Sequence, residues 1–236
     1  KLVDAPLPKL VDHLKSPEQW TRHQARNVLA ERDRDAVAKE LAAWVNKLDP
    51  KDSDHDHHLV EAMWACQNVE RPSEDILKRV LSAKDGHARS AGARVIRYWH
   101  EKLSDPVALL AKAAADPFPR VRMEAILSAG YIPKAEAFSA ALVALDHPRD
   151  AAIDIALPQT VNALESLWRP LLEANKLKFD KESHRDFAER EAGIGFEKRL
   201  GTYLKKKSPG LDETRSIIDR LVSDANVKQA RMVVDA

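Results

Sequence analysis

An amphipathic helical pattern recurs about every thirty residues, and this repetition limits what the chain can fold into. The pattern can be aligned on five positions: Ala25, Ala62, Gly92, Ala125 and Asp154. The intervals between them are 37, 30, 33 and 29 residues (62−25, 92−62, 125−92, 154−125). Each position lies in an amphipathic run that follows a turn and a shorter amphipathic run. Because such a unit can bury its apolar face only against its neighbours, the pattern predicts an all-α solenoid of stacked helical hairpins.

The composition agrees with helices. Only 7 of the 236 residues are glycine, and the long alternation of Val, Ile and Thr that strands show is missing. The charges nearly balance, with 38 Lys and Arg against 37 Asp and Glu, so we do not expect nucleic acid as a partner. No run reaches the roughly 18 apolar residues of a membrane helix, so membrane insertion is not expected. The single cysteine, Cys66, is expected in the core.

Turns rich in Asp, Ser and Pro divide the first two thirds of the chain into five expected helix pairs, and among their helix starts we expect one at Ser16-Pro17 and one at Ser73. Pro158 lies inside the last of these helices and is expected to kink or divide it. Beyond Pro170 the pattern weakens, and further helices are expected at Ser183–Ala192, Gly195–Lys206 and Leu211–Val234. We therefore assign residues 1–180 to the solenoid and 181–236 to C-terminal helices, which form either further repeats or a cap.

The string DPFPRVRMEAILSAG at residues 116–130 resembles the HEAT-repeat pattern of an Asp-Pro turn, Arg-Val-Arg and small apolar positions. The aspartate can cap a helix, the proline fixes the turn, and a small residue such as Ala125 or Gly92 permits close helix contact. This resemblance implies a right-handed α-solenoid of about five to seven HEAT-like repeats.

Four strings, in one order, are similar to the HEAT-repeat segment of bacterial PVC-type membrane-bound dehydrogenases or haem-binding multidomain proteins. They are HHLVEAMW (57–64), ARSAGARVIRYW (88–99), DPFPRVRMEA (116–125) and ALDHPRDAAIDIALPQTVNALESLW (144–168). In that family a sugar-dehydrogenase-like β-propeller precedes the HEAT segment and a c-type cytochrome domain follows it. The resemblance covers about residues 55–180 and is lost after about 192.

The resemblance implies a spacer or docking module of an exported electron-transfer protein, located in the periplasm or at the cell surface. Its partner would be a protein, or neighbouring domains of a longer chain. The sequence starts at Lys1 without an initiator methionine or a signal peptide, which agrees with a processed product or a piece of something longer. Because no Cys-x-x-Cys-His occurs, we expect no haem on this chain, and no other cofactor.

The densest cluster of metal-ligating residue types is DSDHDHH at residues 52–58. Its imidazoles, His55, His57 and His58, could bind Zn²⁺ together with neighbouring carboxylates. The alternative is a polar loop in which Asp54 or Asp56 caps the next helix and the histidines pack at the junction.

Six arginines form a second candidate set: Arg22, Arg89, Arg94, Arg97, Arg120 and Arg122. Three of them precede an aligned position by three residues, so a stacked ladder could recruit an anionic partner. The favoured interpretation is internal, with each arginine paired to an acidic residue of a neighbouring repeat. Asp85, Asp116, Glu124 and Asp150 are the candidates for such pairs.

The five tryptophans (Trp20, Trp44, Trp64, Trp99 and Trp168) recur about once per repeat. At helical spacing beside Leu, Val and Ile they are expected mostly in the core, although an aromatic row could also bind sugars or bases. Tyr98-Trp99-His100 is the expected exception, since three bulky groups in succession cannot all face inward. With two of the arginines, these give the candidate binding residues Tyr98, Trp99, His100, Arg120 and Arg122.

No catalytic residue is assigned, because the chain lacks a Gly-rich phosphate loop, a Gly-x-Ser-x-Gly elbow and a His-Glu-x-x-His motif. The leading hypothesis is therefore a non-catalytic scaffold that mediates protein or inter-domain contacts. Two alternatives stay open. One is a HEAT-like DNA glycosylase, which combines a basic groove with a Trp, an Asp and an Arg, and the other is a carbohydrate-binding accessory module.

Overall fold

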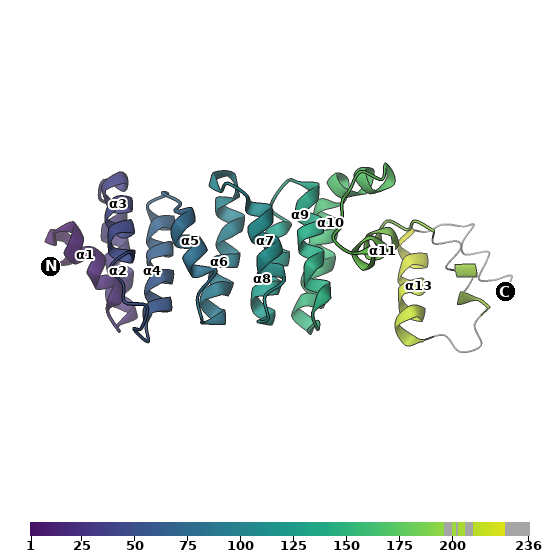
Figure 1. The fold of residues 1–236 in the computed structure, drawn as a ribbon, viewed down its shortest axis with the longest axis horizontal. Helices are drawn as coiled ribbons and strands as arrows, with labels where there is room; N and C mark the ends of the chain where they lie inside the picture. The colour runs from purple at the N-terminus through teal and green to yellow at the C-terminus, as the bar shows by residue number, and fades with distance from the viewer. Residues whose placement is uncertain (196–199, 202, 206–209, 225–236) are drawn as a thin grey trace. The chain divides into compact units, whose positions relative to one another are not determined.

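The computed structural model describes residues 1–195, 200–201, 203–205 and 210–224. All regular secondary structure in this part of the chain is helical, which confirms the predicted all-α class (Figure 1). The chain divides into two compact units, Lys1–Trp168 (unit 1) and Arg169–Ala236 (unit 2). The division falls earlier than the expected boundary after residue 180. Each unit is described here by itself.

Unit 1 is built from five successive helix pairs, which follow one another along the unit in chain order (Figure 1). The pairs are α1 (Leu7–Asp12) with α2 (Gln19–Ala30), α3 (Arg34–Val45) with α4 (His55–Asn68), α5 (Glu74–Val80) with α6 (Gly86–Trp99), α7 (Pro106–Ala114) with α8 (Pro119–Ala129), and α9 (Ala135–Leu142) with α10 (Ala151–Glu173). The last five residues of α10, from Arg169 on, belong to unit 2. Four 3₁₀ turns accompany them: η1 (Leu2–Asp4), η2 (His13–Lys15), η3 (His100–Lys102) and η4 (Val143–Asp146).

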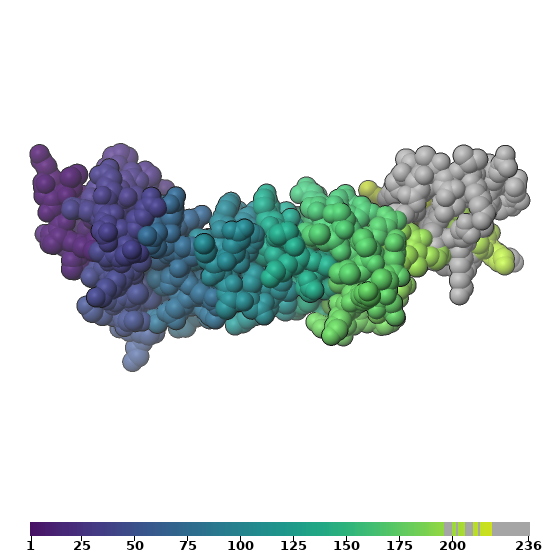
Figure 2. Space-filling view, turned by 90° about the horizontal axis from the view of Figure 1, so that it is seen from above, coloured from purple at the N-terminus to yellow at the C-terminus, as the bar shows by residue number. Residues whose placement is uncertain are grey.

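The helices of unit 1 form two layers. In one layer α2 packs on α4, α4 on α6, and α6 on α8, and in the other α1 packs on α3 and α7 on α9. A space-filling view shows unit 1, coloured purple to green, as a continuous packed body (Figure 2). The core lies between the layers and contains large, fully buried side chains such as Leu29, Leu41, Leu77, Leu110 and Phe138. Each pair thus buries its apolar face against its neighbours, as the repeat predicts.

Side-chain caps explain where several helices begin. Asp33, Ser73, Asp85 and Asp105 each accept a hydrogen bond from a backbone N–H in the first turn of α3, α5, α6 and α7. These bonds satisfy donors that have no partner inside the helix. The start predicted at Ser73 is confirmed.

The start predicted for α2 at Ser16-Pro17 is wrong. There the Ser16 Oγ accepts the Glu18 N–H at 3.3 Å, so these residues form a turn, and the helix begins at Gln19.

The aligned small positions are buried in four of the five repeats: Ala25, Ala62, Gly92 and Ala125. A Cβ on Gly92 would lie 3.1 Å from side-chain atoms of both Val80 and Leu81, so α5 and α6 approach closely at this glycine. Cys66 is fully buried in the same layer, and burial raises the pKa of its thiol to about 12. Its predicted place in the core is confirmed.

The fifth aligned position, Asp154, is wrong by one helical turn. Asp154 is exposed in the first turn of α10, whose N-terminal Ile153 N–H is held by the Asp150 carboxylate at 2.9 Å. Thr160 Oγ1 donates to a carbonyl of α8 at 2.8 Å, just as Ser128 Oγ donates to a carbonyl of α6 at 2.8 Å. Ser128 lies three residues after its aligned alanine, so the equivalent position on α10 is Leu157, which is buried.

Pro158 does not divide α10, which runs as one helix from Ala151 to Glu173. A proline removes one intrahelical hydrogen bond, but the exposed Pro158 lies early in a long helix whose opposite face is buried. The prediction of a divided helix is therefore wrong.

Unit 2 contains α11 (Glu182–Glu191) and α13 (Leu211–Asp224). Leu200 and Ile217 are buried together, with Tyr203 and Leu204 packed against them. The expected helix Gly195–Lys206 and the end of the expected helix Leu211–Val234 fall partly outside the described residues. None of the described helices combines the length and apolar character required to cross a membrane.

Candidate binding groove

Three arginines at the same phase of the repeat close the turns of unit 1. The guanidinium Nη1 of Arg22, Arg89 and Arg122 donates to the two carbonyls five and six residues earlier, at distances of 2.8 to 3.0 Å. Each arginine therefore fixes the turn that leads into its own helix. Its fixed, planar set of donors suits this double contact.

The same arginines also tie one repeat to the next. Arg22 Nε donates to Glu61 at 2.8 Å, and Arg89 forms a two-pronged pair with Asp116 at 2.7 and 2.9 Å. Arg122 Nη2 donates to the Pro148 carbonyl at 2.8 Å. The predicted pairing with an acidic residue of a neighbouring repeat is therefore confirmed for Arg22 and Arg89, whereas Arg122 donates to backbone carbonyls. Arg122, which is only 2% exposed, cannot serve as a binding residue, and that prediction is wrong.

The Arg89–Asp116 pair gives a pH-dependent contribution to stability. Burial raises the pKa of Asp116, but hydrogen bonds from Arg89 and from the Phe118 N–H outweigh it, and the net pKa lies below the ordinary 3.8. A lowered pKa in the folded state stabilises above the unfolded value and loses that effect as pH falls through the folded value. We expect Asp116→Asn to lower the free energy of unfolding by about 2 kcal/mol at pH 7.

This difference should shrink as pH falls below about 3.8. Thermal unfolding of both proteins between pH 7 and pH 2.5 checks it. A difference that stays constant across this range would contradict the assignment.

Two buried glutamates, Glu61 and Glu124, each lie one residue before an aligned alanine, and both are 1% exposed. Glu61 accepts hydrogen bonds from Arg22 and Arg26 of α2. Glu124 accepts from Arg94 at 2.5 Å and from Arg97 at 2.6 Å, both on α6. A carboxylate in such a position must be paired, and two arginines of the neighbouring helix in the same layer supply the compensation.

One face of α4, α6 and α8, together with the turn after α8, carries side chains in three rows. The rows lie five residues before, two residues after and six residues after each aligned position, and all of their residues are exposed except Leu127, which is partly buried. Residues at these spacings share one side of a helix. The nine residues, which we call the even-helix face, are His57, Trp64, Asn68, His87, Arg94, Tyr98, Arg120, Leu127 and Tyr131. Tyr98 and Tyr131 are the most exposed of its aromatic residues, at 61% and 63%.

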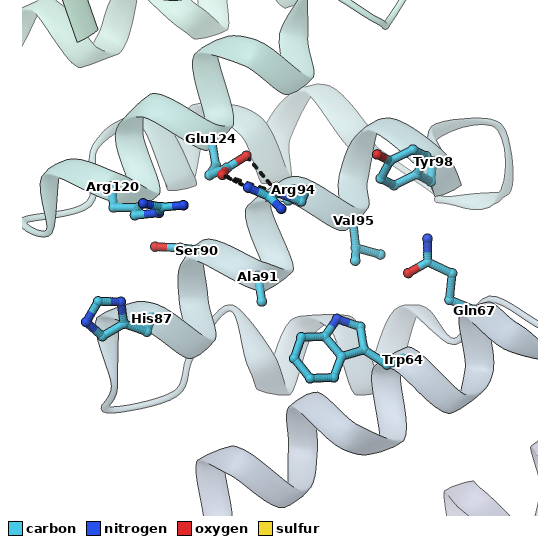
Figure 3. A pocket seen from close by; sticks show the side chains of 10 residues that line it. All are labelled: Trp64, Gln67, His87, Ser90, Ala91, Arg94, Val95, Tyr98, Arg120 and Glu124. Carbon is cyan, nitrogen blue, oxygen red and sulfur yellow. Dashed lines mark hydrogen bonds and ion pairs between the residues drawn. The ribbon is translucent and has the colours of Figure 1, made fainter. Parts of the chain in front are cut away.

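A groove of about 430 Å³ lies within this face, lined by residues of α4, α6 and α8 (Figure 3). Trp64 and Gln67 of α4 form one wall, opposite Arg94 and Tyr98 of α6, and Arg120 and Glu124 come from α8. A volume of this order is typical of sites that hold small molecules or the side chains of a partner.

Guanidinium groups and aromatic rings hold each other in place around the groove. The Arg97 guanidinium carbon lies 5.8 Å from the Tyr98 ring centroid and 5.3 Å from that of Tyr131. Arg26 lies 5.7 Å from the Trp64 ring. These distances suit cation–π contacts, which favour fixed ring positions in exposed aromatics.

Of the predicted binding residues, the structure brings Tyr98 and Arg120 together at the groove. Trp99 is 3% exposed and belongs to the core. Neither ring nitrogen of His100 has a hydrogen-bond partner among the described residues, and both are buried. Since consecutive residues of a helix point about 100° apart, Trp99 turns inward when Tyr98 faces the solvent. The predictions for Trp99 and His100 are therefore wrong.

The predicted metal ligands do not converge. Because α4 already begins at His55, the three imidazoles point in different directions: His55 Nδ1 lies 3.3 Å from Asp56, and the exposed His57 lies 3.7 Å from Glu61. His58 is buried, its ring lies in a T-shaped arrangement with that of Trp44, and burial lowers its pKa. In the described part of the chain, no three His, Cys, Asp or Glu residues are placed to hold a metal ion. The metal prediction is wrong.

The predicted capping roles next to these histidines differ as well. Asp54 stands before α4 without a side-chain hydrogen bond to it. The Asp56 carboxylate instead accepts the Asp85 N–H of the next repeat at 2.8 Å.

Gln67 and His87 line the groove although neither was predicted as a binding residue, and Trp64 lines it although it was expected in the core with most of the tryptophans. The signal that could have found them is the helical phase, because Trp64 lies two residues after its aligned alanine, at the position Arg94 has on α6. No protein-family model, curated protein or solved structure matches the chain.

Proposed function

We propose that this chain is a non-catalytic HEAT-repeat scaffold, a right-handed α-solenoid, that binds a protein partner at the groove of the even-helix face. Its role as a spacer or docking module of an exported multidomain dehydrogenase or cytochrome protein is part of the proposal. That part is supported by the four family-like strings between residues 57 and 168.

The observation that carries the binding role is the pair of exposed aromatic side chains at the groove, Trp64 and Tyr98, which are 37% and 61% exposed. Large aromatic residues with a polar atom are enriched among the residues that dominate protein–protein affinity. The arginine ladder holds the surrounding helices at their turns and between repeats. A partner therefore meets a surface that is already ordered, which lowers the entropic cost of binding.

A selection of random peptides displayed on phage tests this function directly. We expect peptides to be enriched on the wild-type chain, and Tyr98→Ala to weaken their binding about tenfold or more in fluorescence polarisation. Tyr131→Ala is a matched control, because Tyr131 has the same phase, the same degree of exposure and the same Arg97 contact but does not line the groove.

Circular dichroism should show an unchanged melting temperature for both variants. The proposal fails if no peptide is enriched, or if the enriched peptides bind the Tyr98 and Tyr131 variants equally well.

A further inference from the structure

We infer that the segment which occupies this groove is an acidic peptide, with a carboxylate at Arg120 and a bulky apolar side chain between Trp64 and Tyr98. This inference rests on the proposed function and specifies the chemistry of the partner. It follows from which charges at the groove are already neutralised and which are free.

Arg120 differs from the other arginines of α2, α6 and α8. Every other arginine of these helices donates hydrogen bonds to carboxylates or carbonyls of unit 1. These arginines are Arg22, Arg26, Arg89, Arg94, Arg97 and Arg122. Arg120 is exposed and forms no hydrogen bond or ion pair with any described residue. A guanidinium in this state can accept a carboxylate in a two-pronged contact without first losing an internal partner.

The carboxylate of the groove itself does not oppose an acidic ligand. Glu124 lies one turn after Arg120, but its side chain is only 2% exposed and both of its oxygens accept hydrogen bonds from Arg94 and Arg97. The Arg94 side chain is 52% exposed, so one edge of a second guanidinium also faces the solvent. A ligand therefore meets positive charge from α6 and α8 and no free negative charge among the groove-lining residues.

The aromatic residues of the groove add a second requirement, that the ligand carry an apolar group. In Figure 3 the Trp64 indole and the Tyr98 ring lie on either side of one end of the groove, while Arg120 lies toward the other end. A ligand that satisfies both ends must carry an acidic group and a large apolar group a few residues apart. Gln67, beside Tyr98, can donate to or accept from the backbone of such a peptide.

A peptide fits these observations better than a nucleic acid. Single-stranded nucleic acid could stack a base on Trp64, but its affinity depends on a row of cations that follows the phosphates. The groove lining offers two arginines, and one of them is shared with a buried glutamate.

The test is to repeat the peptide selection on wild type and on Arg120→Glu. We expect the wild-type pool to be enriched in Asp or Glu near an aromatic or large aliphatic residue. The Arg120→Glu pool should replace the acidic position with Lys or Arg while it keeps the apolar one. A synthetic, fluorescein-labelled copy of the best wild-type peptide should bind Arg120→Gln about tenfold more weakly. It should bind Lys112→Gln, a change at an exposed lysine of α7, with unaltered affinity.

The possible results distinguish a failure of the acidic-peptide inference from a failure of the proposed scaffold function. Peptides that depend on Tyr98 but show no acidic preference, or that keep their charge pattern on Arg120→Glu, would overturn the acidic partner and leave the scaffold function standing. An empty selection would overturn both. A labelled single-stranded oligonucleotide that binds more tightly than the peptide, and in an Arg120-dependent manner, would replace the peptide by a nucleic acid.

Discussion

Replacing Arg122 with alanine is expected to lower the free energy of unfolding of unit 1 by about 3 kcal/mol. The buried guanidinium donates to the carbonyls of Asp116, Pro117 and Pro148, so it links the turn before α8 to the turn before α10. Alanine would leave these partly buried carbonyls without their donor and would open a cavity. Arg122→Lys should recover little of the loss, because one ammonium cannot reproduce the planar fork that reaches both turns.

Urea unfolding followed by tryptophan fluorescence measures this effect on unit 1 alone, because all five tryptophans lie between residues 20 and 168. The matched control is Arg120→Ala. It removes the same side chain two residues away, where the guanidinium is exposed and unbonded, and should change stability by less than about 0.5 kcal/mol. Equal losses in the two variants would show that the buried contacts of Arg122 contribute nothing specific.

This contrast also shows what sequence could and could not predict. The repeat gave Arg22, Arg89 and Arg122 the same phase, and each of them indeed performs the same structural task. The sequence could not separate Arg120 from Arg122 as binding candidates, since both follow one Asp-Pro turn. Only the position of each residue around α8 decides that one guanidinium meets carbonyls and the other meets solvent.

The fold predictions that failed did so because capping and cross-helix hydrogen bonds, which the hydrophobic periodicity does not reveal, set the register of a helix. Asp154 fits the repeat interval, but Asp150 caps α10, so that Asp154 lies exposed in the first turn of this helix. A carboxylate in the first turn interacts favourably with the helix dipole. Thr160, whose hydroxyl bonds to α8 as Ser128 bonds to α6, shows the true register. A single sequence contains no indication of which residues make such cross-helix hydrogen bonds.

The groove was only partly predictable for a similar reason. Tyr98 was expected to face outward because three bulky neighbours cannot all be buried, and that argument was sound for Tyr98 alone. Trp64 belongs to a different helix, 34 residues earlier in the chain (98−64). Its place opposite Tyr98 depends on how closely α4 and α6 pack, which no local pattern specifies. The prediction for His55, His57 and His58 failed for the opposite reason. These residues are close in sequence and were expected to meet at one metal ion, but side chains of successive residues on a helix point in different directions.

Glu124→Gln is expected to lower the free energy of unfolding of unit 1 by about 3 kcal/mol, comparable to the loss of Arg122. The glutamine has the same size, so the change isolates charge and hydrogen bonding from packing. It would leave the largely buried Arg97 and the half-exposed Arg94 without their common carboxylate. Removing one partner of a buried pair costs far more than the intact pair contributes, because the remaining charge stays desolvated.

Glu101→Gln is the matched control, since Glu101 is exposed and makes no hydrogen bond or ion pair with the described residues, and it should be nearly neutral. The equivalent change at Glu61 should cost a similar amount, because Arg22 and Arg26 pair with Glu61 as Arg97 and Arg94 pair with Glu124, two helix pairs earlier in the chain. If Glu124→Gln and Glu101→Gln unfold at the same urea concentration, the buried glutamates are not what joins α2 to α4 and α6 to α8. The stability of the layer would then come from apolar packing alone, and the frame that holds Trp64 and Tyr98 would not depend on charge.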